Sequence, residues 1–256
     1  MSRVKDIQLK VIPSKIANEF VKKNHYSGKV VPNSSLHFGA FLDEKLHGVM
    51  SYGPSMRKDL IISLVKDTAW NGFIELNRMA FDETLPKFSE SRCIAISIKL
   101  IKKNAPHIKW IVSFADGTQC GDGTIYRASG FKLTGIKENK QLRINPTTNK
   151  PMQSMAAFHA GKAKDFKNWE RLEGYQLRYI YLIDKNSSLT VPIIDFGEID
   201  NVGAGMYKGK NRTLMERKGR NQTANSLMES KCDNISPHTH DVTNIEDKAE
   251  VVKGVV

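Results

Sequence analysis

The residues best suited to chemistry lie between Ser113 and Ala128, in the segment SFADGTQCGDGTIYRA. A run of apolar, β-forming residues ends there at an ionisable side chain, Asp116. A loop with three glycines follows, and then a short segment that carries Tyr126. Open α/β sheets often place a ligand at the carboxyl end of a central strand, beside such a loop. The structural alternative is that Asp116 only caps the next element while the glycines turn the chain.

Two further polar clusters interrupt apolar surroundings. HYSG at 25–28 follows a predicted amphipathic helix, and a histidine beside a tyrosine there is consistent with either packing or catalysis. ELNR at 75–78 places Glu75 and Arg78 inside an apolar strand. Because burying an unpaired charge is costly, each of these two side chains must find a polar partner or a ligand.

A fourth cluster, SESR at 89–92, begins the clearest predicted helix, which runs from about 90 to 104. Free backbone N–H groups and the helix dipole favour an anion there, and the serine hydroxyls and Arg92 add to this. Plain N-capping by Ser89 or Ser91 is the structural alternative.

The elements that must position these clusters alternate between strand and helix. The pattern predicts strands over 36–42, 46–52, 73–80, 108–115, 130–135 and 176–183, a first strand near the start, and helices over 13–24, 90–104 and 124–129. The first two of these numbered strands form a hairpin. This order predicts an α/β protein with a mixed sheet flanked by helices. Residues 137–173 show no clear pattern, and a surface excursion is the simplest interpretation. The segment contains Trp169 and several lysines, so an insertion that contacts the substrate is the alternative.

Composition narrows the class of protein. The chain has 256 residues and a net charge of +12, which favours a polyanionic partner such as nucleic acid. Its three cysteines lie far apart and form no disulfide framework, as expected of a reduced cytoplasm. No run is long and apolar enough to suggest a membrane span. We expect one domain over 1–200 and a disordered tail over 201–256, which is basic at first and then polar.

The clusters together resemble two nested families. A helix with an anion site, followed by a strand that ends in a carboxylate, resembles the GNAT superfamily of acyltransferases, in which one strand splays from its neighbour. The glycine-containing phosphate signature of that superfamily is absent, and KFSESR at 87–92 stands in its place. HYSG, ELNR, Ser91, SFAD and GTIY in this order resemble the Mom proteins of Mu-like bacteriophages, which are divergent GNAT-fold enzymes.

The resemblance implies an activity and a set of site residues. Mom proteins convert the exocyclic amine of adenine in DNA to a carbamoylmethyl (acetamido) derivative, which protects phage DNA from restriction. The matching positions are Arg78, Ser91, Asp116 and Tyr126, with His25 as a further candidate. Also implied are an acetyl-coenzyme A or related acyl-coenzyme A donor, bound iron, and action in the cytoplasm of the infected or lysogenic bacterium. Oligomeric state is left open, with a homodimer as one option.

The chemistry assigns expected roles to these residues. Adenine's amine is a poor nucleophile, so we expect Asp116 to act as a base, with Tyr126 and His25 as catalytic partners. Arg78, Ser91 and Arg92 are expected to bind the cofactor. An iron ion would take His25, Asp116 and Tyr126 as ligands, since all three offer oxygen or nitrogen.

DNA binding is expected to involve the basic segment 208–220, which contains Lys208, Lys210, Arg212, Arg217, Lys218 and Arg220. Two other classes of function stay open. A GNAT acetyltransferase acting on a protein or small-molecule amine would leave no modified adenine. A non-catalytic DNA-binding protein would tolerate Asp116→Ala.

Overall fold

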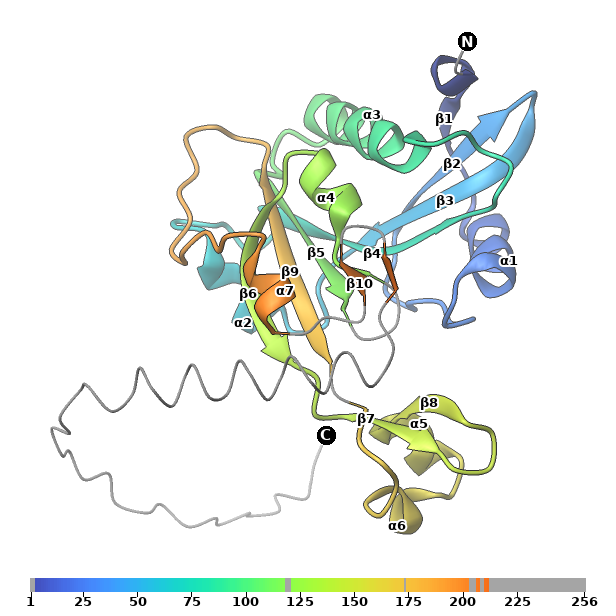
Figure 1. Ribbon diagram of the computed structural model, residues 1–256. Coiled ribbons are helices and arrows are strands. Elements are labelled where there is room, and N and C mark those ends of the chain that lie inside the picture. Colours follow the sequence, from blue (N-terminus) through green and yellow to red (C-terminus); the bar gives the residue numbers. More distant parts are fainter. Residues whose placement is uncertain (1–2, 118–120, 173, 203–205, 208–209, 212–256) are drawn as a thin grey trace, which may run out of the picture.

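The computed structural model describes residues 3–117, 121–172, 174–202, 206–207 and 210–211 (Figure 1). Most of the basic segment and the rest of the tail lie outside these residues, as do Cys120 and Cys232. The elements up to the central sheet's fourth strand are η1 (Arg3–Asp6), β1 (Gln8–Val11), α1 (Ser14–Asn24), β2 (Leu36–Leu42), β3 (Lys45–Gly53), α2 (Lys58–Ile61), η2 (Ile62–Leu64) and β4 (Phe73–Phe81). The elements that follow are α3 (Ser89–Asn104), β5 (Trp110–Asp116), α4 (Thr124–Ala128), β6 (Lys132–Glu138), β7 (Leu142–Asn145), β8 (Lys150–Gln153), α5 (Ser154–His159), α6 (Ala163–Phe166), β9 (Tyr175–Leu182), α7 (Glu198–Asn201), β10 (Met206–Tyr207) and β11 (Lys210–Asn211).

Seven strands form the central sheet in the order β1-β2-β3-β4-β5-β9-β6. The β4–β5 pair is parallel and the other five neighbouring pairs are antiparallel. The predicted mixed sheet flanked by helices is therefore confirmed, and so is the hairpin of β2 and β3. Asp43 and Glu44 turn that hairpin with φ of 49° and 60°, as a tight two-residue turn requires.

The sheet opens between β4 and β5. These strands pair only from Phe73 opposite Trp110 to Leu76 opposite Ser113, after which they diverge. At the same point β4 carries a bulge against β3: Tyr52 faces Leu76 and Ser51 faces Arg78, which leaves Asn77 as the extra residue. Bulges of this kind redirect side chains and are common beside active sites. The split and the bulge together free the ends of both strands for a site.

Two layers of side chains cover the sheet. Ile111 and Ala115 of β5 join the core beneath α3 and α4, whereas Trp110 and Val112 point to the opposite face, where α2 and η2 pack. The alternation follows from the two-residue period of a strand. A third core joins α1 to β3 and β4 through Val21, and Figure 1 shows α1 and α3 on different sides of the sheet. Buried on both faces, the centre of the sheet is a firm support for its open edge.

The start of α3 differs from the expected serine cap. The residue before the helix is Phe88, which has a left-handed conformation with φ of 73°, and no side chain caps the helix. The hydroxyl of Ser89 donates to the carbonyl of Pro86 and that of Ser91 donates to the carbonyl of Phe88, at 3.2 Å in the second case. The prediction that Ser89 or Ser91 is the N-cap was therefore wrong, because both hydroxyls bond backward to carbonyls.

Residues 139–172, which we call the insertion, form a small unit between β6 and β9. It contains the two-stranded sheet of β7 and β8 and the short helices α5 and α6, and it lies beyond one end of the central sheet (Figure 1). Leu142, Ala157, Phe166 and Leu172 are its buried apolar residues. This stretch of the chain, expected to be an irregular surface excursion, is a folded unit beside the split.

Candidate functional site

Two adjoining cavities occupy the split between β4 and β5. The larger has a volume of about 420 Å³ and the smaller about 240 Å³. Both are lined by the same six residues, which we call the shared wall: Tyr26, Leu76, Asn77, Arg78, Phe114 and Asp116. The shared wall thus combines the diverging ends of β4 and β5 with the residue that follows His25.

The smaller cavity brings together four residues that the sequence singled out. His25, Arg78, Asp116 and Tyr126 all line it, although 101 positions separate the first from the last. The loop and first residues of α4, from Gly121 to Tyr126, supply much of its remaining surface. The fold therefore places these four residues around one space.

The larger cavity has a wall that the sequence did not predict. The insertion contributes Asn139, Leu142, Ala156 and residues 151–153, and the central sheet contributes Glu75 and Gln176. Asn139, Gln153 and Gln176 carry amides, which offer both hydrogen-bond donors and acceptors. No sequence pattern marked Asn139 and Gln153, since both belong to the stretch without a clear period, and Gln176 was marked only as the first residue of a predicted strand.

Asp116 stands at the end of β5, where its carboxylate meets a tyrosine. The hydroxyl of Tyr26 lies 3.4 Å from its Oδ2, a long distance for an O–H···O hydrogen bond. Tyr26 is 53% exposed and packs against the His25 ring, with 4.3 Å between centroids. Tyr126 is instead buried, with its ring 5.3 Å from that of Tyr179. Tyr26, quoted in the HYSG motif but given no role, is thus the tyrosine seen to contact Asp116.

Arg78 is held in place by main-chain carbonyls. Its Nε donates to the carbonyl of Lys29 at 2.9 Å, and its Nη1 donates to that of Asn77 at 3.1 Å. These bonds satisfy the expectation that a charge inside β4 finds polar partners. They also fix a positive charge in the shared wall.

His25 is neutral at neutral pH. Burial, together with the nearby charge of Arg78, lowers the pKa of His25 to about 4. Its Nδ1 lies 2.8 Å from the hydroxyl of Ser27. A group with this pKa is a weak base at pH 7, so the imidazole is better suited to hydrogen bonding than to proton removal.

Glu75 is the second carboxylate near the split, and it lines only the larger cavity. The Ser55 hydroxyl donates to it, and burial raises the pKa of its carboxyl. In the neighbouring bulge, Asn77 Oδ1 accepts from Ser34 at 2.8 Å, while its Nδ2 is buried without a partner among the described residues. An orphaned donor of this kind in a cavity wall is costly unless a ligand satisfies it.

The loop before α4 is shaped by Asp122 and Gly123. Asp122 is buried, and its Oδ1 accepts from the backbone N–H of Thr124 at 3.0 Å and from its hydroxyl at 2.7 Å. Gly123 has φ of 73°, and a Cβ there would lie 2.4 Å from the ring of Tyr179. Only glycine meets both conditions, which explains one of the three glycines seen in the sequence.

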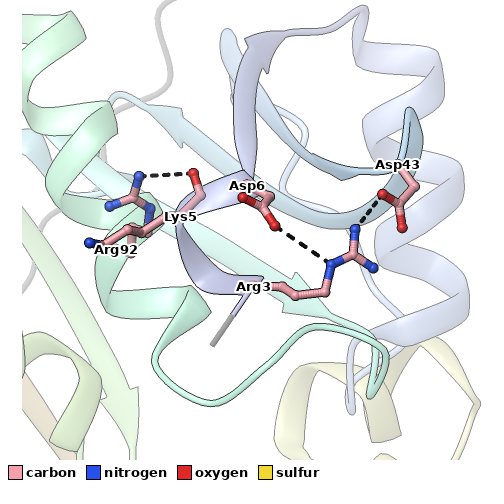
Figure 2. A network of polar contacts seen from close by, with 5 residues as sticks. All are labelled: Arg3, Lys5, Asp6, Asp43 and Arg92. Carbon is pink, nitrogen blue, oxygen red and sulfur yellow. Dashed lines mark hydrogen bonds and ion pairs between the residues drawn. The ribbon is translucent and has the colours of Figure 1, made fainter. Parts of the chain in front are cut away.

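Ser91 and Arg92 do not line either cavity. Figure 2 shows Arg92 reaching from α3 to the carbonyl of Lys5, at 3.3 Å, beside the ion pair of Arg3 with Asp43. The Nε of Arg92 is buried without a hydrogen-bond partner among the residues described. The expected cofactor-binding roles of Ser91 and Arg92 stay predictions.

The residues expected to hold iron do not form a fitting ligand set. Within the described ranges, no group of three His, Cys, Asp or Glu side chains is placed to hold a metal ion. His25 uses its Nδ1 for Ser27, and Tyr126 is packed among aromatic rings. No step proposed below uses a metal.

The predicted DNA-binding residues Lys208, Arg212, Arg217, Lys218 and Arg220 lie outside the described residues, and Lys210 is described only as part of β11. In the part of the chain that is described, no helix has the length and apolar character needed to cross a membrane.

The fold and the site together define a class: a mixed α/β protein whose sheet opens between two parallel strands to hold two joined cavities. The chain belongs to the Mom protein family, whose family model matches residues 6–196. It is 35% identical, over 136 residues, to the methylcarbamoylase Mom of Escherichia phage Mu. That match covers 53% of this chain and 56% of the phage Mu protein, so it spans just over half of the relative's length.

Similar solved structures come from acetyltransferases. A Bacillus subtilis acetyltransferase in complex with coenzyme A is 13% identical, with a TM-score of 0.42, over 69% of this chain and 97% of that one. A GNAT family acetyltransferase from Elizabethkingia anophelis with acetyl-coenzyme A bound is 14% identical, with a TM-score of 0.43, over 69% and 98% of the two chains.

Proposed function

We propose that this chain is a bacteriophage DNA-modifying enzyme that attaches a carbamoylmethyl group to the exocyclic amine of adenine. It would act in the cytoplasm of the bacterial host and protect phage DNA from restriction. The observation that carries the proposal is that two cavities meet along one wall that contains Arg78 and Asp116. A reaction that joins two substrates needs such a boundary, where the reacting atoms are held face to face. Membership of the Mom family supports DNA adenine as the substrate class.

The larger cavity is assigned to adenine. Its volume of about 420 Å³ falls in the range typical of pockets that hold small ligands. The adenine amine is hidden inside duplex DNA, so the base must leave the stack before it can react. The amides of Asn139, Gln153 and Gln176 can hydrogen-bond the edge of the extruded base. Phe114 and Leu142 offer apolar surface to its face.

The smaller cavity is assigned to the acyl donor, acetyl-coenzyme A or a related thioester. Leu76, Met79 and Phe114 give it apolar walls suited to the arm of coenzyme A. The first turn of α3 presents backbone N–H groups, at Glu90 and Ser91, that have no partner four residues back and suit a phosphate. When bound, the donor supplies an activated acyl group. Acetyl-coenzyme A alone would give an acetylated amine, because its acetyl group contains no nitrogen. For a carbamoylmethyl product, the donor must be a related coenzyme A derivative that already carries the –CH2–C(=O)NH2 group on its sulfur.

Asp116 is proposed to remove the proton from the adenine amine. The lone pair of this nitrogen is delocalised into the ring, so a positioned base assists as the new N–C bond forms. The proton passes to the carboxylate of Asp116, which the hydroxyl of Tyr26 contacts. The new N–C bond forms at the methylene carbon of the donor's carbamoylmethyl group, and the bond from that carbon to sulfur breaks, so that the thiolate leaves with the bonding electron pair. Arg78, held by two carbonyls, places a positive charge beside the developing negative charge of this thiolate. Tyr126 lines the same cavity, where its phenol is proposed to protonate that thiolate.

Glu75 is proposed to hold adenine rather than to act as the base. Burial raises the pKa of its carboxyl, and the carboxyl lines the larger cavity, where it can form a hydrogen bond with the edge of adenine. Pairs of acids whose surroundings differ in this way commonly divide the work of a site.

The test is to express the chain in bacteria, digest the cellular DNA to nucleosides and search for new adenine derivatives by mass spectrometry. We expect an adenosine carrying a carbamoylmethyl group. An acetylated adenine would correct the group that is transferred. Unmodified DNA in cells that contain the folded chain would contradict the proposal and favour an acetyltransferase acting on another amine.

A further inference from the structure

The insertion carries a concentration of positive charge. Residues 139–172 include seven basic and two acidic residues, a net charge of +5. Two of the arginines are used internally: Arg143 donates to the carbonyl of Trp169 at 2.7 Å, and Arg171 pairs with Glu138. The side chains of Lys150, Lys164 and Lys167 are exposed. The charge is therefore presented to solvent on the unit that walls the larger cavity.

Helix α5 separates that cavity from solvent. Ala156 lines the cavity and Ala157 is fully buried, whereas Met155 and Phe158 are 64% and 65% exposed. Positions three apart lie on the same face of a helix, so these two large apolar side chains project together. Among the described residues, the Phe158 ring meets the neighbouring ring of His159 edge-on, with 5.7 Å between centroids, yet most of both apolar side chains stays exposed on a charged unit.

The helix is anchored rather than loose. The backbone N–H of Ser154 donates to the carbonyl of Gln141 at 3.0 Å, and its hydroxyl lies 2.5 Å from Gln141 Oε1. At the other end, the N–H of Lys162 donates to the carbonyl of Ala157 at 2.8 Å. Met155 and Phe158 are thus held at a fixed distance from the cavity that Ala156 lines.

We propose that the insertion is the DNA-gripping element of this enzyme, and that Met155 and Phe158 enter the base stack as a wedge beside the adenine that occupies the larger cavity. The inference rests on the proposed function. Lysines on the insertion hold the phosphates, and the wedge fills the space that the extruded base leaves. Proteins that extrude or unstack bases commonly use an apolar wedge of this kind, and methionine and phenylalanine are typical of it. The positive charge around the pair favours DNA over an apolar protein surface.

The experiment uses the full chain and a set of DNA duplexes, each with one 2-aminopurine in place of adenine. The fluorescence of 2-aminopurine rises on unstacking, and the set covers every combination of the two neighbouring bases. Wild type should raise the fluorescence in at least one context. The double variant Met155→Ala, Phe158→Ala should lose most of that rise and lower the amount of modified adenine in cellular DNA about tenfold, the effect of losing one good stacking contact. Leu60→Ala is the matched control, since Leu60 is 58% exposed on α2, away from both cavities.

DNA binding measured at several salt concentrations tests whether lysines of the insertion hold the phosphates. Lys164→Glu with Lys167→Glu should weaken binding to all duplexes alike and flatten the salt dependence, whereas the wedge variant should keep the slope of wild type. A wedge variant that unstacks 2-aminopurine and modifies DNA as well as wild type would overturn the inference. If wild type unstacks the base through Phe158 but leaves DNA unmodified, the wedge stands and the proposed reaction fails.

Discussion

The two cavities of this protein are built from different kinds of structure. The smaller lies among elements of the central fold, the strands β4 and β5 of nine and seven residues and the five-residue helix α4, whose inner side chains are buried in one core. The larger borrows one wall from the insertion, whose strands have four residues each and whose helices have six and four. The smaller cavity, where the donor and the catalytic base are proposed to act, thus has the rigid support of the central fold. The side that must admit a DNA base is a separate, smaller unit.

The difference also appears in the two carboxylates. Asp116 belongs to the shared wall and contacts an exposed tyrosine, whereas Glu75 faces only the larger cavity and is buried against Ser55. Their surroundings suit different tasks: one suits proton removal at the boundary and the other suits holding the base. The predictions below separate the two regions, in order of decreasing effect.

Replacing Asp116 by Asn should have the largest effect, because it removes the base from the boundary while keeping the size of the side chain. We expect modified adenine in cellular DNA to fall roughly 10²- to 10⁴-fold, the usual contribution of a positioned acid or base. Asp184→Asn is the matched control, since this aspartate pairs with Lys109 at 3.4 Å and accepts from the backbone N–H of Asn186 at 3.0 Å, and it lines neither of the two cavities. Equal loss in both variants would remove Asp116 from its proposed role.

Glu75 should respond differently to two substitutions. Glu75→Ala removes one hydrogen-bonding group from the larger cavity and should lower modification at least about tenfold, whereas Glu75→Gln keeps a hydrogen-bonding group at this position and most of the activity. The pKa of Glu75 is raised on folding, so the native state loses stability as pH rises through the raised value. Glu75→Gln should therefore melt at a higher temperature than wild type at alkaline pH. A lower melting temperature there would show that the carboxylate stabilises the fold.

Substitutions at two glycines with positive φ, one in each region, show how readily each region adjusts to an added side chain. Gly123 would place a Cβ 2.4 Å from Tyr179, whereas a Cβ at Gly161, in the insertion, would have no neighbour within 4 Å. Gly161→Ala should cost only the backbone strain, about 1 kcal/mol. Gly123→Ala should cost roughly 3 kcal/mol, because overpacking adds to the strain. Urea unfolding measures the loss of unfolding free energy in both variants. Equal losses would mean that the loop before α4 shifts to accept the added methyl group.

His25 should give the smallest effect, visible only on acidification. Its pKa is lowered to about 4 in the folded chain and returns to about 6.5 on unfolding, so the unfolded state binds the extra proton between these values. The stability contributed by neutral His25 is present above about pH 6.5 and is lost as pH falls towards about 4. His25→Gln should melt with a shallower pH dependence over this interval. An unchanged dependence would place the acid sensitivity elsewhere.

Much of the central fold could be predicted because its elements have clear periods. The hairpin, the strands that carry ELNR and SFAD, and helix α3 all lie within a few residues of their expected positions. The position of Asp116 at a strand end, and its meeting with HYSG and Arg78, follow from the order of these elements.

The rest could not be predicted for physical reasons. The insertion has too few apolar residues in any one element to show a period, so its fold was not predicted, and contact with the substrate was only the alternative to a surface excursion. Asn77 is the extra residue of a bulge in β4, and sequence spacing does not reveal where a strand is bulged. Asp122 reads as one polar residue among glycines, and only the fold shows that it is buried beside Tyr179, whose hydroxyl donates to its carbonyl at 2.5 Å.

The most direct test of the two-cavity account is an experimental structure of the full chain bound to coenzyme A and to a DNA duplex that contains adenine. We predict the thiol end of coenzyme A in the smaller cavity and an extruded adenine in the larger one, with sulfur and amine facing each other at Asp116. Coenzyme A bound away from the split between β4 and β5, or an adenine that enters from the side of α4, would contradict the account.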